Sequence, residues 1–251
     1  MVMNDTLQLM HSFITSAAEQ DIPLVFKGSV VLDTMLKSEG LSGLSKGTRD
    51  IDGDLRIAEN VTNDKLERDI RRVISDMKDP ELSVTTKREL KPGQTVSFEV
   101  SKDGTGIFSV DVGCDATRGT SVYVNAEAVE FIGVSKESMV ADKAQTVSSQ
   151  LVFRRIKDLF DLYALSCLPY KWEAVCQEVK NRGREFGDFS DFINHAEDIV
   201  HAYDKFKGIE NKPPFEEVYL RVRDFLHLFI KGAGNICADW SPTDRVWYLN
   251  N

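Results

Sequence analysis

Hydrophobic and polar positions follow two different periods along the chain. Over residues 3–19 the apolar side chains recur at helical spacing, which predicts an opening amphipathic helix. A short apolar run over 23–26 then meets Gly28 and Ser29, and residues 30–37 return to a helical pattern. The pattern therefore predicts a strand, a tight turn and a helix whose first turn carries Ser29.

The next segment, LSGLSKGTRDIDGDLRI, begins with glycines and small polar residues and then alternates through Ile51 and Leu55. This change is typical of a loop that enters a strand. Residues 63–78 repeat apolar side chains at helical spacing, and Asn63 or Asp64 is available as the N-cap of that helix.

Between residues 82 and 124 the period changes to two, in the runs LSVTTKREL, TVSFEV, GIFSVDVG and SVYVN. SKDGTG is a hairpin turn in this pattern. After Gly133 the pattern is helical to the end, most clearly over 215–231. We therefore predict an α+β protein, in which a mixed sheet with flanking helices (residues 1–135) is followed by an all-helical domain (residues 136–251).

Composition narrows the class of protein. The chain is 42% hydrophobic and 28% charged with 7 Pro, as in an ordered globular protein. No run reaches the ~18 apolar residues of a membrane span, and the N-terminus lacks signal-peptide features, so we expect a cytoplasmic protein without a membrane partner. The four cysteines form no CxxC pair, which argues against a zinc site. The net charge of −9 argues against unspecific binding to nucleic acid, although a local basic groove stays open.

The first group of candidate functional residues is acidic. Asp50 and Asp52 lie two positions apart on the predicted strand and so point to one face, close enough to share a divalent cation. Mg²⁺ favours a few carboxylates together with substrate phosphates. The turn at Gly28 and Ser29 would supply a helix N-terminus for those phosphates. Asp111, on a later strand, is the best candidate for a third carboxylate of a two-metal site.

Simpler interpretations exist for these residues. Two aspartates at this spacing are common in surface loops, and Gly-Ser is ordinary turn chemistry. Asp52 and Asp54 form an equally spaced pair. We prefer Asp50 and Asp52 because Gly53 loosens the strand directly after them.

The second group lies in RIKDLFD. On a helix, Arg155, Lys157, Asp158 and Asp161 would share one broad polar face. An exposed ladder, in which Arg154 pairs with Asp158 and Lys157 with Asp161, would stabilise the helix by only ~0.2–0.5 kcal/mol a pair. On the residues alone, this ladder is the favoured interpretation.

The combination of these motifs favours a functional site over the exposed ladder. Gly-Ser, then Asp-x-Asp on a strand, then a lysine-bearing helix and RIKDLFDLYAL resemble the AbiEii family of nucleotidyltransferases, the toxins of type IV toxin–antitoxin and abortive-infection systems. RIKDLFD fits the RxKDxxD motif of that family at every fixed position. The segment ADKAQ resembles the family's lysine segment and contains Lys143. One departure is the insertion GLSGLSKG, which lengthens the spacing between Ser29 and Asp50.

The resemblance implies a fold of the DNA polymerase β type and transfer of a nucleoside monophosphate from an NTP to an acceptor hydroxyl. It implies a tRNA 3′ end as the acceptor and a cognate antitoxin as a partner. Mg²⁺ or Mn²⁺ would be the cofactor. The implied metal ligands are Asp50, Asp52 and Asp111, the implied catalytic residues add Lys143 and Asp158, and the implied nucleotide-binding residues are Gly28, Ser29, Lys143, Arg155, Lys157 and Asp161.

Two other functions fit the same residues. The first is a nucleotidyltransferase that modifies a small molecule, as antibiotic-modifying enzymes do. The second is a protein that binds an NTP without turning it over.

Overall fold

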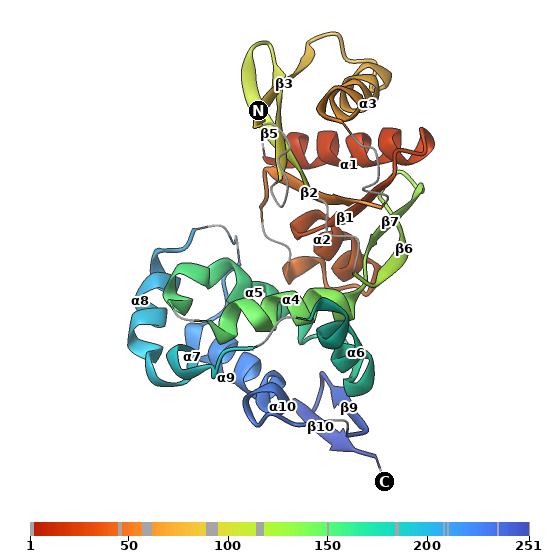
Figure 1. Ribbon diagram of the computed structural model, residues 1–251. Coiled ribbons are helices and arrows are strands. Elements are labelled where there is room, and N and C mark those ends of the chain that lie inside the picture. Colours follow the sequence, from red (N-terminus) through yellow and green to blue (C-terminus); the bar gives the residue numbers. More distant parts are fainter. Residues whose placement is uncertain are drawn as a thin grey trace. The chain divides into compact units, whose positions relative to one another are not determined.

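The chain divides into two compact units (Figure 1). One contains Met1–Ser42 and Lys46–Val134, and the other contains Gly43–Ser45 and Ser135–Asn251. We call them unit 1 and unit 2 and describe each by itself. The computed structural model describes residues 3–44, 47–56, 62–88, 95–113, 118–149, 151–183, 186–207, 209, 211–234 and 236–250.

Unit 1 is built on a seven-stranded sheet with the strand order β3-β4-β5-β2-β1-β7-β6. Strand β1 is parallel to β7 and β2 is parallel to β5, while the other neighbours are antiparallel. This confirms the predicted mixed sheet with flanking helices. Its elements are α1 (Met3–Glu19), β1 (Leu24–Lys27), α2 (Ser29–Ser38), β2 (Asp50–Leu55), α3 (Asn63–Asp76), β3 (Leu82–Arg88), β4 (Val96–Lys102), β5 (Thr105–Gly113), β6 (Thr120–Val124) and β7 (Glu130–Val134).

The two faces of this sheet differ in polarity. Ile51, Phe98 and Val110 lie in register on β2, β4 and β5, and each is almost fully buried. Phe13 of α1 packs edge-on against Phe108 of β5, with ring centroids 6.2 Å apart, so α1 lies on this apolar face. Because successive strand residues point to opposite faces, the acidic positions of β2 are on the other face.

The hairpin between β4 and β5 confirms the turn predicted from SKDGTG. Its two loop residues, Asp103 and Gly104, have φ angles of 49° and 74°. Asp-Gly is favoured in two-residue hairpin loops because both positions need a positive φ.

Two details of unit 1 differ from the sequence-based expectation. The N-cap of α3 is Thr62, whose hydroxyl accepts a hydrogen bond from the Lys65 backbone N–H at 3.2 Å, and not Asn63 or Asp64. Strand β7 was not predicted. This strand is short and includes Gly133. A side chain does not fit at that position, because a Cβ at Gly133 would come within 3.0 Å of the Tyr123 and Val31 side chains.

Unit 2 is mainly helical but also contains a three-stranded sheet in the order β10-β9-β8. The expectation of an all-helical domain therefore misses this sheet. Its strands have only two to four residues, too few to show a period. The elements of unit 2 are α4 (Lys136–Ser148), η2 (Val152–Arg155), α5 (Ile156–Leu165), β8 (Tyr170–Lys171), α6 (Trp172–Arg182), α7 (Ser190–Asn194), α8 (Ala196–Lys205), α9 (Phe215–Phe225), α10 (His227–Ile230), β9 (Ala238–Ser241) and β10 (Val246–Leu249).

The long helix predicted over 215–231 is two helices, α9 and α10, separated at Leu226. The indole N–H of Trp247 donates to the Phe225 carbonyl at 2.9 Å. This bond takes up a carbonyl that a continuous helix would use for its own next turn. Within the described part of the chain, none of the helices has the length and apolar character that crossing a membrane requires.

Removal of the α3 cap should have a measurable cost. Thr62→Ala deletes the hydroxyl that receives the Lys65 N–H, so we expect the free energy of unfolding to fall by about 1 kcal/mol. Urea denaturation followed by circular dichroism would measure the change. Thr62→Ser retains the hydroxyl and should stay close to wild type, and equal stability of the Ala and Ser variants would contradict the assignment.

Candidate active site

Three aspartates of unit 1 lie on the polar face of two neighbouring parallel strands. Asp50 and Asp52 are on β2, and Asp111 of β5 is the direct Cα partner of Asp52. Asp50 is paired in the same register with Ser109. The strand register thus brings Asp111, which lies 59 residues beyond Asp52 in sequence, beside the acidic pair.

Local contacts fix the orientation of the two carboxylates on β2. The Ser109 hydroxyl donates to Asp50 Oδ1 at 2.7 Å. Gly28 has a φ of 74°, and a Cβ there would lie 2.5 Å from Asp52 Oδ2. Gly28 is therefore required twice, once for its backbone conformation and once for the close approach of Asp52.

The same glycine precedes helix α2. No side chain caps this helix, and Ser29 is its first residue. The backbone N–H groups of a helix N-terminus attract anions, and here they lie next to the residue that contacts Asp52. The predicted association of Gly28 and Ser29 with the acidic strand is consistent with this geometry.

Asp54 has a different role from Asp50 and Asp52. It is 1% exposed, and its carboxylate lies 2.6 Å from Lys27 Nζ and 3.1 Å from Arg118 Nε. A carboxylate buried between two cations is occupied as their partner. This favours Asp50 and Asp52 over the equally spaced pair Asp52 and Asp54. Neither Lys27 nor Arg118 was predicted as part of the site, and only the position of Lys27 directly before Gly28 could have suggested it.

The residues present fit a magnesium ion. Carboxylate oxygens on neighbouring strands are hard ligands, and Mg²⁺ is commonly bound by one or two of them together with substrate phosphates. In the ranges that the structure describes, no group of three or more His, Cys, Asp or Glu side chains is placed so that it could hold a metal ion. A metal at this face would therefore take its remaining ligands from the substrate and from water.

The second group of candidate residues lies in unit 2. Lys143 of α4 contacts two residues of α5, with Nζ 2.5 Å from Asp158 Oδ1 and 2.9 Å from Asp161 Oδ2. Burial of this ammonium lowers the pKa of Lys143, but the charges of Asp161 and Asp158 outweigh burial and raise that pKa above its ordinary value. Lys143 is therefore cationic throughout the neutral range.

This arrangement corrects the expectation of one broad polar face on α5. Asp161 is buried, Asp158 is half-buried, and both pair with Lys143 of another helix instead of belonging to an exposed ladder. Arg155 and Lys157, in contrast, are exposed. RIKDLFD thus combines a buried and a half-buried acid with two exposed cations.

Helix α4 is held in place by a buried arginine. Arg182 of α6 forms an ion pair with Asp142, the neighbour of Lys143. Its Nη2 also donates to the Ser138 carbonyl at 2.8 Å and to the Ser138 hydroxyl at 2.9 Å. These contacts link α6 to the middle of α4 and so restrict the position of Lys143.

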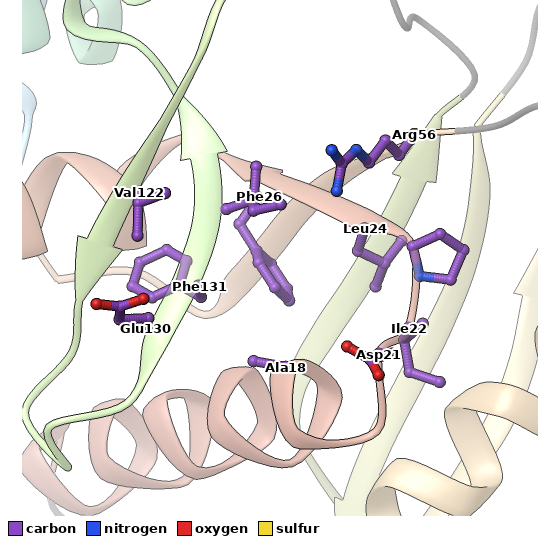
Figure 2. Close-up of a pocket in the computed structure, with 11 residues that line it drawn as sticks. Ala18, Asp21, Ile22, Leu24, Phe26, Arg56, Val122, Glu130 and Phe131 are labelled. Carbon is purple, nitrogen blue, oxygen red and sulfur yellow. The ribbon is translucent and has the colours of Figure 1, made fainter.

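A cavity of about 600 Å³ lies elsewhere in unit 1 (Figure 2). Leu24, at the start of β1, lines it, whereas Gly28 follows the end of that strand. Its lining also includes Phe26 and Phe131, whose ring centroids lie 5.8 Å apart. The aspartate that lines it is Asp21, which does not belong to the polar face of β2 and β5. We do not assign the candidate chemistry to this cavity.

Comparison with solved structures gives the class of fold. The chain is similar to JHP933 from Helicobacter pylori, with 16% identity and a TM-score of 0.58 over 92% of each chain. It is also similar to MenT4, a nucleotidyltransferase toxin of Mycobacterium tuberculosis, with 12% identity and a TM-score of 0.52 over 91% of this chain and 90% of that one. The fold is therefore that of nucleotidyltransferases.

The family follows from the sequence match. Residues 12–223 match the family described as nucleotidyl transferase AbiEii toxin, type IV TA system. The chain belongs to this family, and it is a nucleotidyltransferase. No curated protein matches the chain.

Loss of the Lys143 ammonium should destabilise unit 2. Lys143→Met leaves Asp158 and Asp161 without their common cation, and we expect the free energy of unfolding to fall by about 3 kcal/mol. Adding Asp161→Asn should recover part of this loss, because it removes the charge of one of the two acids that were paired with Lys143. Chemical denaturation measures both variants.

Lys87→Met is the matched control, since Lys87 and Glu99 form an exposed pair on β3 and β4. It should change stability by no more than about 1 kcal/mol. A Lys143→Met variant as stable as this control would refute the structural importance of the buried ion pair.

Proposed function

We propose that the protein transfers a nucleoside monophosphate from an NTP to an acceptor hydroxyl, with pyrophosphate as the leaving group and Mg²⁺ or Mn²⁺ as the cofactor. The observation that supports this most strongly is the register of β2 and β5, which pairs Asp52 with Asp111 on the polar face. The close approach of Gly28 to the Asp52 carboxylate is the second observation that supports the proposal, because Gly28 directly precedes the N-terminus of α2.

In this proposal Asp50 and Asp52 would hold the divalent cation, and Asp111, the direct strand partner of Asp52, would join them as a ligand once the cation is bound. A bound cation in such a site polarises the phosphoryl group and lowers the pKa of the attacking hydroxyl. The Ser109 hydroxyl keeps the Asp50 carboxylate in one orientation. The backbone of Gly28, with φ in the left-handed region, allows Asp52 to approach it closely. The protein's contribution is thus positional and electrostatic.

Ser29 and the first turn of α2 bind the triphosphate in this proposal. Their support is the uncapped N-terminus of α2, where N–H groups and the end of the helix dipole favour an anion. A triphosphate oxygen bound there would be adjacent to the carboxylates that share its cation.

Lys143 offsets negative charge on the leaving pyrophosphate. An ammonium has three N–H donors, so its contacts with Asp158 and Asp161 do not exhaust it. Asp158 and Asp161 orient the lysine in this account, and the exposed Arg155 and Lys157 provide further contacts with the nucleotide. Their support is the RIKDLFD motif together with the pairing of its acids with Lys143.

The biological role follows from the family. Membership supports a toxin of a type IV toxin–antitoxin system, with a cognate antitoxin as partner and action in the cytoplasm. For the acceptor we propose the 3′ end of a tRNA. The acceptor is the part of the proposal that an experiment must identify directly.

Asp52→Asn should abolish transfer without unfolding the protein. Loss of one carboxylate weakens the cation site, and we expect incorporation of labelled NTP into total RNA to fall by more than about 100-fold. Each of the four labelled NTPs is tested with total RNA, and the labelled RNA is identified by size and sequence.

The control is Glu99→Gln, because Glu99 lies on the same polar sheet face but pairs with Lys87. It should retain full activity. Transfer by Asp52→Asn at the wild-type rate would contradict the proposed site. Label in a small-molecule panel but not in RNA would replace the tRNA acceptor with a small one.

A further inference from the structure

We propose that Lys27 is an additional phosphate-binding residue of the active site and that the buried Asp54 positions it. This inference rests on the function proposed above and extends the site by one strand, from β2 to β1. The ligand is the polyphosphate part of the nucleotide. Asp54 does not contact the substrate in this account and acts only through Lys27.

The pairing and the exposure of Lys27 motivate this assignment. One carboxylate, Asp54, is paired with two cations, Lys27 and Arg118. The buried Asp54 carboxylate thus holds the Lys27 ammonium in place. Asp54 is 2% exposed at its side chain, whereas Lys27 retains 22% exposure. The Lys27 ammonium is thus partly accessible although it is paired with Asp54.

The position of Lys27 brings its ammonium to the face of the carboxylates. Lys27 is the direct Cα partner of Asp52 across β1 and β2, and it immediately precedes Gly28. Asp52 in turn is the partner of Asp111. The ammonium therefore belongs to the same polar face as the proposed cation site, one residue before the turn that leads into α2.

The surrounding backbone is shaped to hold this arrangement. A Cβ at Gly113 would lie 2.5 Å from Asp54 Oδ1 and 3.6 Å from Lys27 Nζ. The glycine thus leaves room for the carboxylate and the ammonium above β5. A lysine fixed by such a contact loses less rotamer entropy when a phosphate binds, and preorganisation of this kind increases affinity.

Binding of inorganic tripolyphosphate tests the proposal, because it needs neither an acceptor nor turnover. Isothermal titration calorimetry compares wild type with Lys27→Met and Lys27→Arg. Lys27→Met should weaken binding about tenfold, which is the loss of roughly one charge-assisted hydrogen bond. Lys27→Arg should bind nearly as well as wild type. The matched control is Lys87→Met, which removes a lysine from the same face and should leave the affinity unchanged.

The Asp54→Asn variant distinguishes two roles of Asp54, which are positioning of the Lys27 ammonium and neutralisation of the neighbouring cations. If Asp54 only neutralises its neighbours, removal of its charge makes the cluster more positive and tightens tripolyphosphate binding. If Asp54 positions Lys27, the same variant weakens binding, and the double variant with Lys27→Met is no weaker than Lys27→Met alone. In steady-state transfer, both single variants should raise KM for the NTP more than they lower kcat.

Two results would overturn the inference. One is wild-type affinity for tripolyphosphate in Lys27→Met, and the other is tighter binding by Asp54→Asn. If Asp54→Asn does not fold, the Lys27 variants still decide whether this lysine binds phosphate. Wild-type protein that binds tripolyphosphate through Lys27 but transfers no nucleotide would contradict the proposed function and leave this inference intact.

Discussion

Repulsion between like charges on one sheet face is the constraint on which the rest of the structure depends. Strand β2 places Asp50, Asp52 and Asp54 on the same side, and β5 adds Asp111 directly beside Asp52. Like charges opposite one another on neighbouring strands destabilise a sheet. Asp54 is paired with Lys27 and Arg118, and Asp50 accepts a hydrogen bond from Ser109. We propose that Asp52 and Asp111, which are direct partners across these strands, share the cation.

The need to balance charges also explains the ion pairs in unit 2, where the central charge is a cation and its partners are acids. A buried ammonium is costly alone, and Lys143 is therefore held by two carboxylates of the neighbouring helix. The pairing explains why an apolar helix such as α5 carries acids on a buried side. It also predicts that changes at Lys143 affect stability and activity together, so that activity alone is a poor measure of its role.

Much of the fold could be predicted because its signals are local. The period of the apolar residues is enough to predict α1, β2 and the strands of the antiparallel region, and Asp103 and Gly104 are enough to predict their hairpin. The short strands of unit 2 could not be predicted, because two to four residues do not define a period. They are held by distant aromatic contacts such as that between Phe225 and Trp240.

The candidate site divides in the same way. Asp50 and Asp52 could be selected by their spacing, and Asp111 by its place on a later strand. The partners of Asp54 could not be found, because Lys27 and Arg118 come from other strands and loops and no spacing rule connects them. The pairing of Lys143 with the acids of α5 was equally hidden, since helical spacing alone favours pairs within one helix.

The central claim is that the aspartates of β2 hold a divalent cation that is shared with the nucleotide. Electron paramagnetic resonance of Mn²⁺ in the presence of a non-hydrolysable NTP tests it most directly. We predict a protein-bound Mn²⁺ with hyperfine coupling to nucleotide phosphorus in wild type and in Glu99→Gln, and loss of this species in Asp52→Asn. The same Mn²⁺ signal in Asp52→Asn as in wild type would contradict the account.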